Sequence, residues 1–245
     1  MDTTTSTSIA AVDCACVIHS DGYDWQYVER LYNMLSRNLS RPVRFHVYTE
    51  AHRSVPNHMI KHVLTEWSGV GGPKQSWWYK MQLFNSAHFS GPLLYFDLDV
   101  VIVGNLDWIT ELPQRNFWTI HDFRRLWKPT SRTINSSVMY FDTRLYQYVW
   151  DQFQQQPLGI VMATHKGDQD FITQTVEAKH LRYFDLNRIL SWRWQVVNDG
   201  FRQRRPTKNQ SPTAVKIPNT ASILVFHGEP KPHQIDDPSI VAHWL

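Results

Sequence analysis

The sequence contains very little cysteine and no long apolar segment. Of 245 residues only Cys14 and Cys16 are cysteines, too few for the disulfide framework of a small secreted protein. No stretch approaches the roughly 18 consecutive apolar residues of a membrane span. Residues 1 to 10 are Thr/Ser-rich and lack the basic start and apolar core of a signal peptide. We therefore expect reduced thiols, no transmembrane segment and a cytoplasmic location.

An excess of charge of one sign is also missing. The chain has 25 Lys and Arg against 22 Asp and Glu, a balance that does not by itself indicate a nucleic-acid partner. Hydrophobic residues make up 42% and charged residues 19%, which is the composition of a globular protein. The length suits one large α/β domain. We expect a disordered tail at residues 1–11 and a single domain over residues 12–245.

Several common catalytic motifs are absent. The first strand-to-helix turn has no Gly-x-Gly-x-x-Gly or Walker motif, so any nucleotide must be held by other means. No serine lies in a nucleophile elbow, and neither cysteine is flanked by activating groups. The sequence therefore gives no support to a hydrolytic triad.

Hydrophobic periodicity indicates alternating strands and helices. A strand at residues 12–19, a helix at 24–38 and a strand at 43–48 form a unit typical of parallel strands joined by a right-handed crossover. We therefore predict an α/β fold, Rossmann-like, with a mixed and mainly parallel central sheet. Further strands are expected at 58–66, 92–96, 100–103, 116–120, 137–142, 181–184 and 222–226, helices at 76–88, 144–153 and 168–178, and a long loop at 199–219.

Two acidic residues follow the apolar strand predicted at residues 92–96. Because side chains alternate along an extended backbone, we expect Asp97 and Asp99 to point to one side and Leu98 to the other. Two neighbouring carboxylates repel each other unless a cation lies between them, and carboxylate oxygens are ligands of magnesium, manganese and calcium. The alternative is a pair of turn-forming aspartates. The second apolar run, at residues 100–103, favours a metal site at the carboxyl end of a strand.

Two residues near the end of the chain could extend such a site. His227 follows the last predicted strand, and Lys231 comes four residues later. A neutral imidazole could complete the metal coordination, and a mixed oxygen and nitrogen shell favours manganese. Lys231 could face a phosphate. Alternatively, the histidine bonds only the backbone and the lysine is solvated.

Two further groups of polar residues lie at element boundaries. Asp168 and Gln169 open a predicted helix, where an acid is favoured by capping and the helix dipole but an amide gains little. The residues Asn135, Ser136 and Ser137 lead into a predicted strand, where they could bond the hydroxyls of a ligand or form a turn. Lys80 lies near the start of the helix expected at 76–88.

Four ordered motifs resemble one family of enzymes. They are Tyr-Phe-Asp-Leu-Asp-Val-Val-Ile-Val-Gly-Asn-Leu, Ile-Asn-Ser-Ser-Val-Met-Tyr-Phe-Asp, Gly-Asp-Gln-Asp-Phe-Ile and Val-Phe-His-Gly-Glu-Pro-Lys-Pro-His. Together they resemble the GT-A nucleotide-sugar glycosyltransferases, in particular glycosyltransferase family 8. The stretch from residue 23 to residue 49 is similar to a bacterial and phage branch of these proteins. The resemblance spans nearly the whole chain.

The resemblance implies a single-domain GT-A fold and a set of roles, which we take as expectations. They are Asp97, Asp99 and His227 for the metal, Mn²⁺ or Mg²⁺; Lys231 for the diphosphate; Asn135 and Ser136 for the donor sugar; and Asp168 and Gln169 for the reacting face of that sugar. We also expect Lys80 and Asp97 to contact the donor, and Tyr23, just after the first strand, to contact the base. There are departures from the family pattern. His227 adjoins Gly228 instead of preceding it by three positions, His233 replaces a tryptophan, and Ser136 and Ser137 stand where Ala-Gly is common.

The implied function is metal-dependent transfer of a hexose from a nucleoside diphosphate sugar, expected to be a UDP-sugar, to an acceptor hydroxyl with retention. The acceptor could be a glycan, a lipid-linked sugar, a protein or a small molecule. One alternative is a metal-dependent nucleotidyltransferase. Another is a non-catalytic carbohydrate- or nucleic-acid-binding protein, although we do not expect a nucleic-acid partner. Such a protein would use the basic residues Arg124, Arg125, Lys128, Arg202, Arg204, Arg205 and Lys208.

Overall fold

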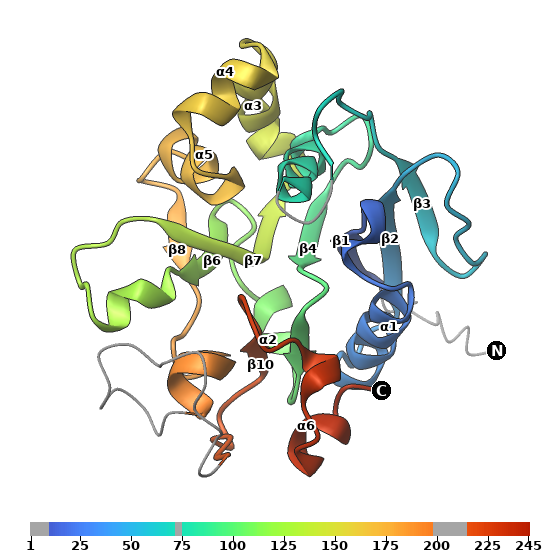
Figure 1. Cartoon of the computed structure of the whole chain (residues 1–245), viewed down its shortest axis with the longest axis vertical. Helices are drawn as coiled ribbons and strands as arrows, with labels where there is room; N and C mark the ends of the chain where they lie inside the picture. The colour runs from blue at the N-terminus through green and yellow to red at the C-terminus, as the bar shows by residue number, and fades with distance from the viewer. Residues whose placement is uncertain (1–9, 72–74, 198–214) are drawn as a thin grey trace, which may run out of the picture.

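The structure is a computed structural model that describes residues 10–71, 75–197 and 215–245 (Figure 1). Its central sheet has seven strands in the order β3-β2-β1-β4-β7-β6-β8. Strand β7 is antiparallel to β4 and β6, and the other pairings are parallel, which confirms the predicted mixed, mainly parallel sheet. The strands are β1 (Val12–Val17), β2 (Val43–Thr49), β3 (Ile60–Val63), β4 (Pro92–Phe96), β6 (Phe117–His121), β7 (Ile134–Asp142) and β8 (Leu181–Tyr183).

A second, smaller sheet contains strands β5 (Val100–Ile102), β10 (Ile223–Val225) and β9 (Ile189–Ser191) in that order. Strand β10 is antiparallel to β5 and parallel to β9. The sequence predicted β5 and β10 as strands but predicted neither β9 nor the existence of a separate sheet. The chain crosses from the central sheet to the small sheet between β4 and β5, at residues 97–99.

Residues 97–99 form a turn between the two sheets. The amide of Asp97 donates to the carbonyl of Ser137 in the central sheet at 2.8 Å. The carbonyl of Asp99 accepts from the amide of Phe226, next to the small sheet, at 3.1 Å. Because residues 98 and 99 are in a turn, our expectation of an extended backbone was wrong for this triplet. The turn nevertheless brings both carboxylates into one pocket, described below.

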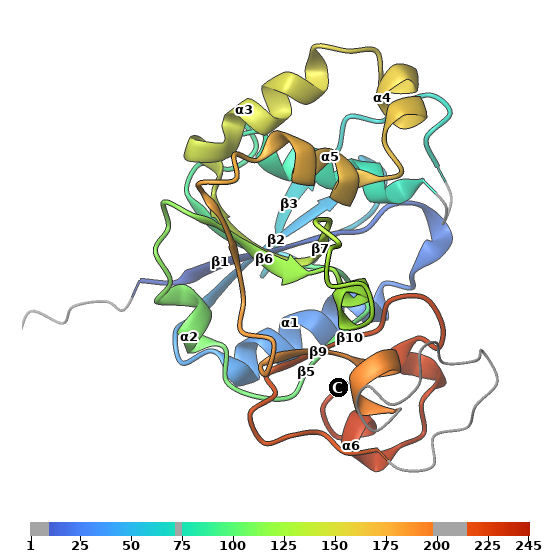
Figure 2. The ribbon, with the colours of Figure 1, turned by 90° about the vertical axis from the view of Figure 1, so that its left-hand side faces the viewer.

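Helices cover both faces of the central sheet. Figure 2 shows α3 (Thr143–Gln154), α4 (Leu158–Thr164) and α5 (Asp168–Thr175) on one side of it, and α1 (Gln26–Asn38) with the small sheet on the other. The predicted helix at 76–88 is instead the 3-10 helix η2 (Ser76–Phe84), and Ser76 is not its N-cap, because Gln75 precedes it there. The sequence did not predict α4. The remaining elements are η1 (Ser20–Gly22), α2 (Asp107–Thr110), η3 (Phe123–Leu126), the π-helical turn η4 (Trp192–Val196), η5 (Pro232–Gln234) and α6 (Pro238–Val241).

Alternation along β1 divides the core between the two faces of the central sheet. Cys14 and Cys16 point toward the α1 side, where Leu31 of α1 is fully buried, and Ala15 points toward η2 and α3. Burying one such leucine contributes about 2 kcal/mol. Burial also raises the pKa of both cysteine thiols, which are unpaired. Buried thiols with a raised pKa are poor nucleophiles.

Some predictions lie outside the described residues. Residues 1–9 of the predicted tail and most of the predicted loop at 199–219 belong to this group, as do Arg202, Arg204, Arg205 and Lys208. Within the described ranges, no helix has both the length and the apolar character required to cross a lipid bilayer.

Candidate active site

A cavity of about 350 Å³ opens at the carboxyl ends of β1 and β4, the edge at which open α/β sheets bind ligands. It brings together nearly all of the site residues that the sequence predicted. The predicted residues that line it are Tyr23, Lys80, Asp97, Asp99, Asn135, Asp168, Gln169, His227 and Lys231. The exception is Ser136, whose neighbour Ser137 lines the cavity instead.

The buried ammonium of Lys80 links two of the carboxylates. Its Nζ lies 2.8 Å from Oδ1 of Asp97 and 3.4 Å from Oδ2 of Asp168. Burial by itself would lower the pKa of Lys80, but the carboxylates of Asp168 and Asp97 raise it above its ordinary value. The hydroxyl of Tyr95 donates to the same oxygen of Asp97 at 2.6 Å. Lys80 therefore stays charged and holds η2, α5 and the turn after β4 around one point.

The carboxylate of Asp99 has a different pair of partners. Its Oδ2 accepts from Nζ of Lys231 at 2.5 Å and from the hydroxyl of Tyr23 at 2.9 Å. Burial raises the pKa of Asp99, as does the nearby Asp97, while the hydrogen bonds and charge of Lys231 and Tyr23 offset part of that rise. The two carboxylates thus face the same cavity, each paired with its own lysine.

Asp168 does not cap its own helix. Its buried carboxylate accepts from the hydroxyl of Ser136 at 2.5 Å, and Gly167 is the N-cap of α5. The amide of Ser136 donates to Oε1 of Gln169 at 3.3 Å. Because side chains alternate along β7, Asn135 and Ser137 face the cavity and Ser136 lies behind its wall. Ser136 therefore positions Asp168 and Gln169 from outside the cavity.

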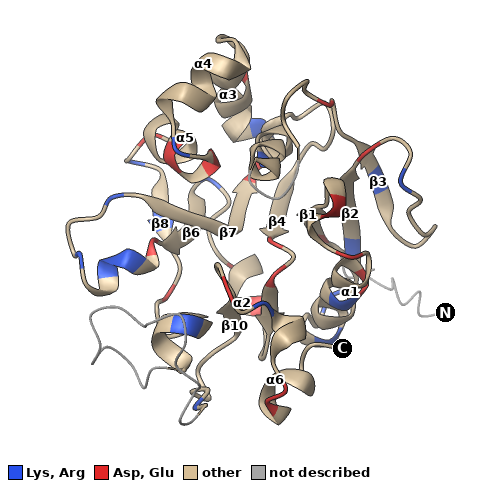
Figure 3. Ribbon diagram, viewed as in Figure 1, with Lys and Arg blue, Asp and Glu red and all other residues tan. Residues whose placement is uncertain are grey.

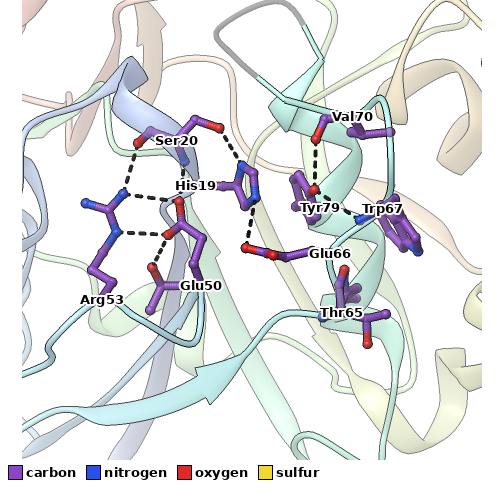
Figure 4. Close-up of polar contacts among 11 residues, drawn as sticks. His19, Ser20, Glu50, Arg53, Thr65, Glu66, Trp67, Val70 and Tyr79 are labelled. Carbon is purple, nitrogen blue, oxygen red and sulfur yellow. Dashed lines mark hydrogen bonds and ion pairs between the residues drawn. The ribbon is translucent and has the colours of Figure 1, made fainter.

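The loop that carries Tyr23 is fixed by Glu50 (Figure 4). Ser20 has a φ of +60°, a left-handed conformation that costs a non-glycine residue about 1 kcal/mol. Its amide donates to Glu50 at 2.5 Å, and Arg53 donates to the other oxygen of Glu50 at 2.9 Å. Burial would raise the pKa of Glu50, but Arg53 and the amide of Ser20 lower it to about 2. His19, which lines the cavity, stacks on Tyr79 at 3.8 Å between ring centroids.

His227 lines the cavity, but it contacts Ser191 and Phe123 and pairs with neither of the two aspartates. Its Nε2 lies 2.7 Å from the hydroxyl of Ser191, and its ring stacks on Phe123 with centroids 5.2 Å apart. Burial and the charges of Arg193 and Lys231 lower the pKa of His227 to about 4, so the imidazole is neutral. Among the residues that the structure describes, no three His, Cys, Asp or Glu side chains are grouped closely enough to hold a metal ion.

The donor set of the cavity nevertheless suits a hard divalent cation in part. Asp97 and Asp99 offer carboxylate oxygens, the ligands that Mg²⁺ and Mn²⁺ prefer. The three carboxylates of Asp97, Asp99 and Asp168 against the two ammonium groups of Lys80 and Lys231 leave one net negative charge in the cavity. This excess of negative charge favours a cation. His227 as the third ligand stays a prediction.

Sequence reasoning missed several residues of the cavity wall, among them His19, Trp77, Tyr95 and Gly228. A signal existed for Tyr95, which precedes Asp97 by two residues and so shares its side of the strand. No pattern marks Trp77, because the 3-10 helix that places it was predicted as an α-helix.

Comparison with known proteins finds likeness in structure alone. No protein-family model and no curated protein matches the sequence. The galactosyltransferase LgtC, solved with donor and acceptor sugar analogues, aligns with a TM-score of 0.61 at 10% identity over 95% of each chain. An active-site mutant of LgtC with glutamate in place of glutamine aligns with a TM-score of 0.62 at 10% identity, over 93% of this chain and 91% of that one.

A third solved structure agrees with these two. The bifunctional glycosyltransferase WbbM aligns with a TM-score of 0.64 at 12% identity, over 96% of this chain. The chain spans 50% of the WbbM chain. At such identities the likeness concerns the fold. The chain therefore has the GT-A fold of these glycosyltransferases, as its motifs indicated.

Proposed function

We propose that the protein is a glycosyltransferase that moves a hexose from a nucleoside diphosphate sugar, expected to be a UDP-sugar, to an acceptor hydroxyl. The observation that carries this proposal is the cavity itself. It joins paired carboxylates, two lysines and an Asp168–Gln169 pair at the ligand-binding edge of a GT-A sheet. LgtC, which has this fold, is a galactosyltransferase with a glutamine in its active site. Gln169 is the glutamine of the present cavity.

The charge balance supports a divalent cation, Mn²⁺ or Mg²⁺, held by Asp97 and Asp99. A diphosphate would be repelled by a cavity with one net negative charge, whereas two added positive charges reverse its sign. The cation, when bound, acts as a Lewis acid that stabilises negative charge on the phosphates. His227 is our candidate for a third ligand. Its neutral imidazole has the protonation state that coordination requires.

The lysines have a second role in the presence of substrate. The ammonium of Lys231 now pairs with Asp99, and that of Lys80 with Asp97 and Asp168. Once Asp97 and Asp99 hold a cation, the ammonium groups of both lysines could instead pair with the diphosphate of a donor bound in the same cavity. Charge-assisted bonds to phosphate in a partly buried site are worth about 1.5–3 kcal/mol each. Tyr23, whose hydroxyl donates to Asp99, is our candidate for a contact with the base.

Asp168 and Gln169 would face the reacting carbon of the sugar. The bond between this carbon and the diphosphate breaks with its electron pair on the leaving oxygen, and the acceptor oxygen forms the new bond. The acceptor proton passes to an oxygen of the departing diphosphate. An amide is a poor nucleophile, so we propose retention with electrostatic support of an oxocarbenium-like state by Gln169 and Asp168. Asn135 and Ser137 would bond the sugar hydroxyls.

The first experiment is a thermal-shift panel of nucleoside diphosphate sugars with Mn²⁺, repeated with a chelator. We expect one donor to raise Tm only when the metal is present, because a ligand that binds the folded state alone stabilises it. Product analysis then separates the alternatives. A glycosyltransferase releases nucleoside diphosphate, whereas a nucleotidyltransferase releases pyrophosphate. No metal-dependent shift with any nucleotide would favour a non-catalytic binding protein.

The direct test is the Asp99→Asn variant, assayed by slow hydrolysis of the donor sugar without an acceptor. We expect the fold to remain and hydrolysis to fall by at least about 100-fold, since one carboxylate of the pair is lost. Circular dichroism checks the fold. Retained hydrolysis in this variant would place the metal elsewhere and refute the role of the pair.

A further inference from the structure

A basic face with exposed aromatic surface lies beside the cavity. It comprises the exposed Arg124, Lys128 and Arg132, the half-buried Arg125 and the indole of Trp127, which is 39% exposed. These residues belong to η3 and the segment that joins it to β7. Figure 3 shows their basic positions gathered on the η3 side of the molecule. We refer to them below as the η3 face.

The η3 face is joined to the cavity by a chain of packed aromatic rings. Trp127 packs edge-on against Trp194 of η4 with centroids 4.3 Å apart, and Trp194 packs against His227 at 4.1 Å. His227 also stacks on Phe123 of η3, and it lines the cavity. The η3 face is therefore continuous, through packed rings, with the wall of the cavity that His227 forms.

Most of the cations of the η3 face have no acidic side chain paired with them in the described part of the chain. Among the residues that the structure describes, Arg124 alone in this group pairs with an acid, Asp122, at 2.6 Å. Arg125 lies 3.0 Å from Nδ1 of His121, whose pKa is lowered to about 4 by burial and by Arg125, so that this histidine is neutral. Among the described residues, no ion pair joins Arg125, Lys128 or Arg132 to an acid. Elsewhere among the described residues, the exposed Arg44 and Lys179 are paired with acids, whereas the exposed Lys166 and Arg182 are not.

We propose that the η3 face binds the acceptor and that the acceptor is an anionic glycan, one that carries carboxylate or phosphate groups on its sugars. This inference rests on the proposed function and adds the class of acceptor to it. Guanidinium groups pair with carboxylates and phosphates in a planar geometry, and an exposed indole stacks on the apolar face of a sugar ring. A neutral glycan would use the ring but leave the cations without partners.

The test measures binding of labelled oligosaccharides by fluorescence anisotropy, with no donor present. The probes are a tetrasaccharide with alternating glucuronate residues, a poly(glycerol phosphate) oligomer, neutral maltotetraose and a single-stranded DNA oligonucleotide. We expect one of the two anionic glycan-type probes to bind at least about tenfold more tightly than maltotetraose and to weaken as salt rises. The two probes distinguish carboxylate from phosphate recognition.

The variant Arg125→Gln/Lys128→Gln removes two cations of the η3 face. We expect it to raise the Kd of the anionic probe by about tenfold. The fold-change in Kd should be at least about five times the fold-change in the rate of donor hydrolysis. The matched control is Lys179→Gln/Arg182→Gln, which removes two exposed cations around β8 and should bind as the unmodified protein does. Trp127→Ala should weaken binding without reducing its salt dependence.

Three results would overturn the proposal. They are equal affinity for maltotetraose and both anionic glycan probes, tighter binding of the DNA than of either, and equal losses in the test and control variants. None of these results bears on the donor. Donor hydrolysis with Mn²⁺ tests the proposed function separately. A glycosyltransferase with a neutral acceptor would hydrolyse the donor in that assay but would not prefer the anionic probes in the binding assay.

Discussion

Nζ of Lys231 lies 2.5 Å from Oδ2 of Asp99, although 132 residues separate them in the sequence. This contact joins the loop after β10 to the turn after β4, at the point where we place the diphosphate. We expect Lys231→Met to lower kcat/KM for the donor by about 10- to 100-fold, because one charge-assisted bond to phosphate is lost. Steady-state kinetics of donor hydrolysis measures this.

The control for Lys231→Met is Lys179→Met. Lys179 is exposed and pairs only with the exposed Glu177, at 2.6 Å, and a surface pair of this kind adds little to stability. We expect the control to keep the kinetics of the unmodified protein. Equal kcat/KM in the two variants would contradict a role for Lys231 in holding the diphosphate.

The buried Lys80 should matter for stability as well as for catalysis. Lys80→Met leaves the carboxylates of Asp97 and Asp168 without their shared cation, and breaking a buried ion pair from one side costs about 3–5 kcal/mol. Denaturant unfolding measures the loss. The double variant Lys80→Met/Asp168→Asn should recover part of it, since one uncompensated charge is then removed. If the single variant were as stable as the unmodified protein, the ion pair would not form in solution.

Gln169 should affect the chemical step more than donor binding. We expect Gln169→Ala to lower kcat by about 10- to 100-fold with little change in donor affinity, because its amide would support charge that develops only in the transition state. Gln174→Ala, an exposed position on the same helix, is the control. Mass spectrometry of the enzyme during turnover should find no sugar attached to Gln169. A trapped adduct there would replace electrostatic support with covalent catalysis.

A histidine pair at the edge of the central sheet should make folding sensitive to acid. Nε2 of His62 lies 2.8 Å from Nδ1 of His46, and burial with the nearby His46 and His88 lowers the pKa of His62 to about 4. Since the folded pKa lies below the unfolded value of 6.5, the unfolded chain takes up the proton first as pH falls. The stability from His62 is therefore complete above pH 6.5 and is lost as the pH falls to about 4.

The measurement for this prediction is urea unfolding between pH 7 and pH 4, with His62→Gln as the comparison. His62 is partly exposed, so we expect the unmodified protein to lose only about 1–2 kcal/mol more than the variant over this range. Other histidines with lowered pKa, such as His121 and His227, contribute equally to both proteins. Parallel pH profiles would contradict a lowered pKa of His62 in the folded protein.

The sequence was most informative where one local pattern determined the result. Alternation along β1 places Cys14 and Cys16 on one face of the sheet and Ala15 on the other, and the apolar spacing of α1 buries Leu31 in the core. The site residues came from motifs in distant parts of the chain. The structure brings them together because the carboxyl ends of β1 and β4 meet at one edge.

The failures have physical causes of their own. Ser136 and Ser137 are both polar, so the motif alone could not tell which faces the cavity; the phase of β7 decides this. The π-helical turn at Trp192 and the strand β9 carry no short-range period, and their conformation depends on packing against β10 and Phe226. The partners of Asp97 and Asp99 also depend on tertiary structure, since Lys80 and Lys231 lie far from them in the sequence.

The turn at residues 97–99 has a consequence for the protein as a whole. The backbone of Asp97 is bonded to β7 in the central sheet, and that of Asp99 to the residue after β10 in the small sheet. The distance between the two carboxylates therefore depends on how the two sheets pack against each other, and neither sheet alone determines it. No fragment that keeps only one sheet could present the pair, so this cavity should not be transferable to a shorter chain.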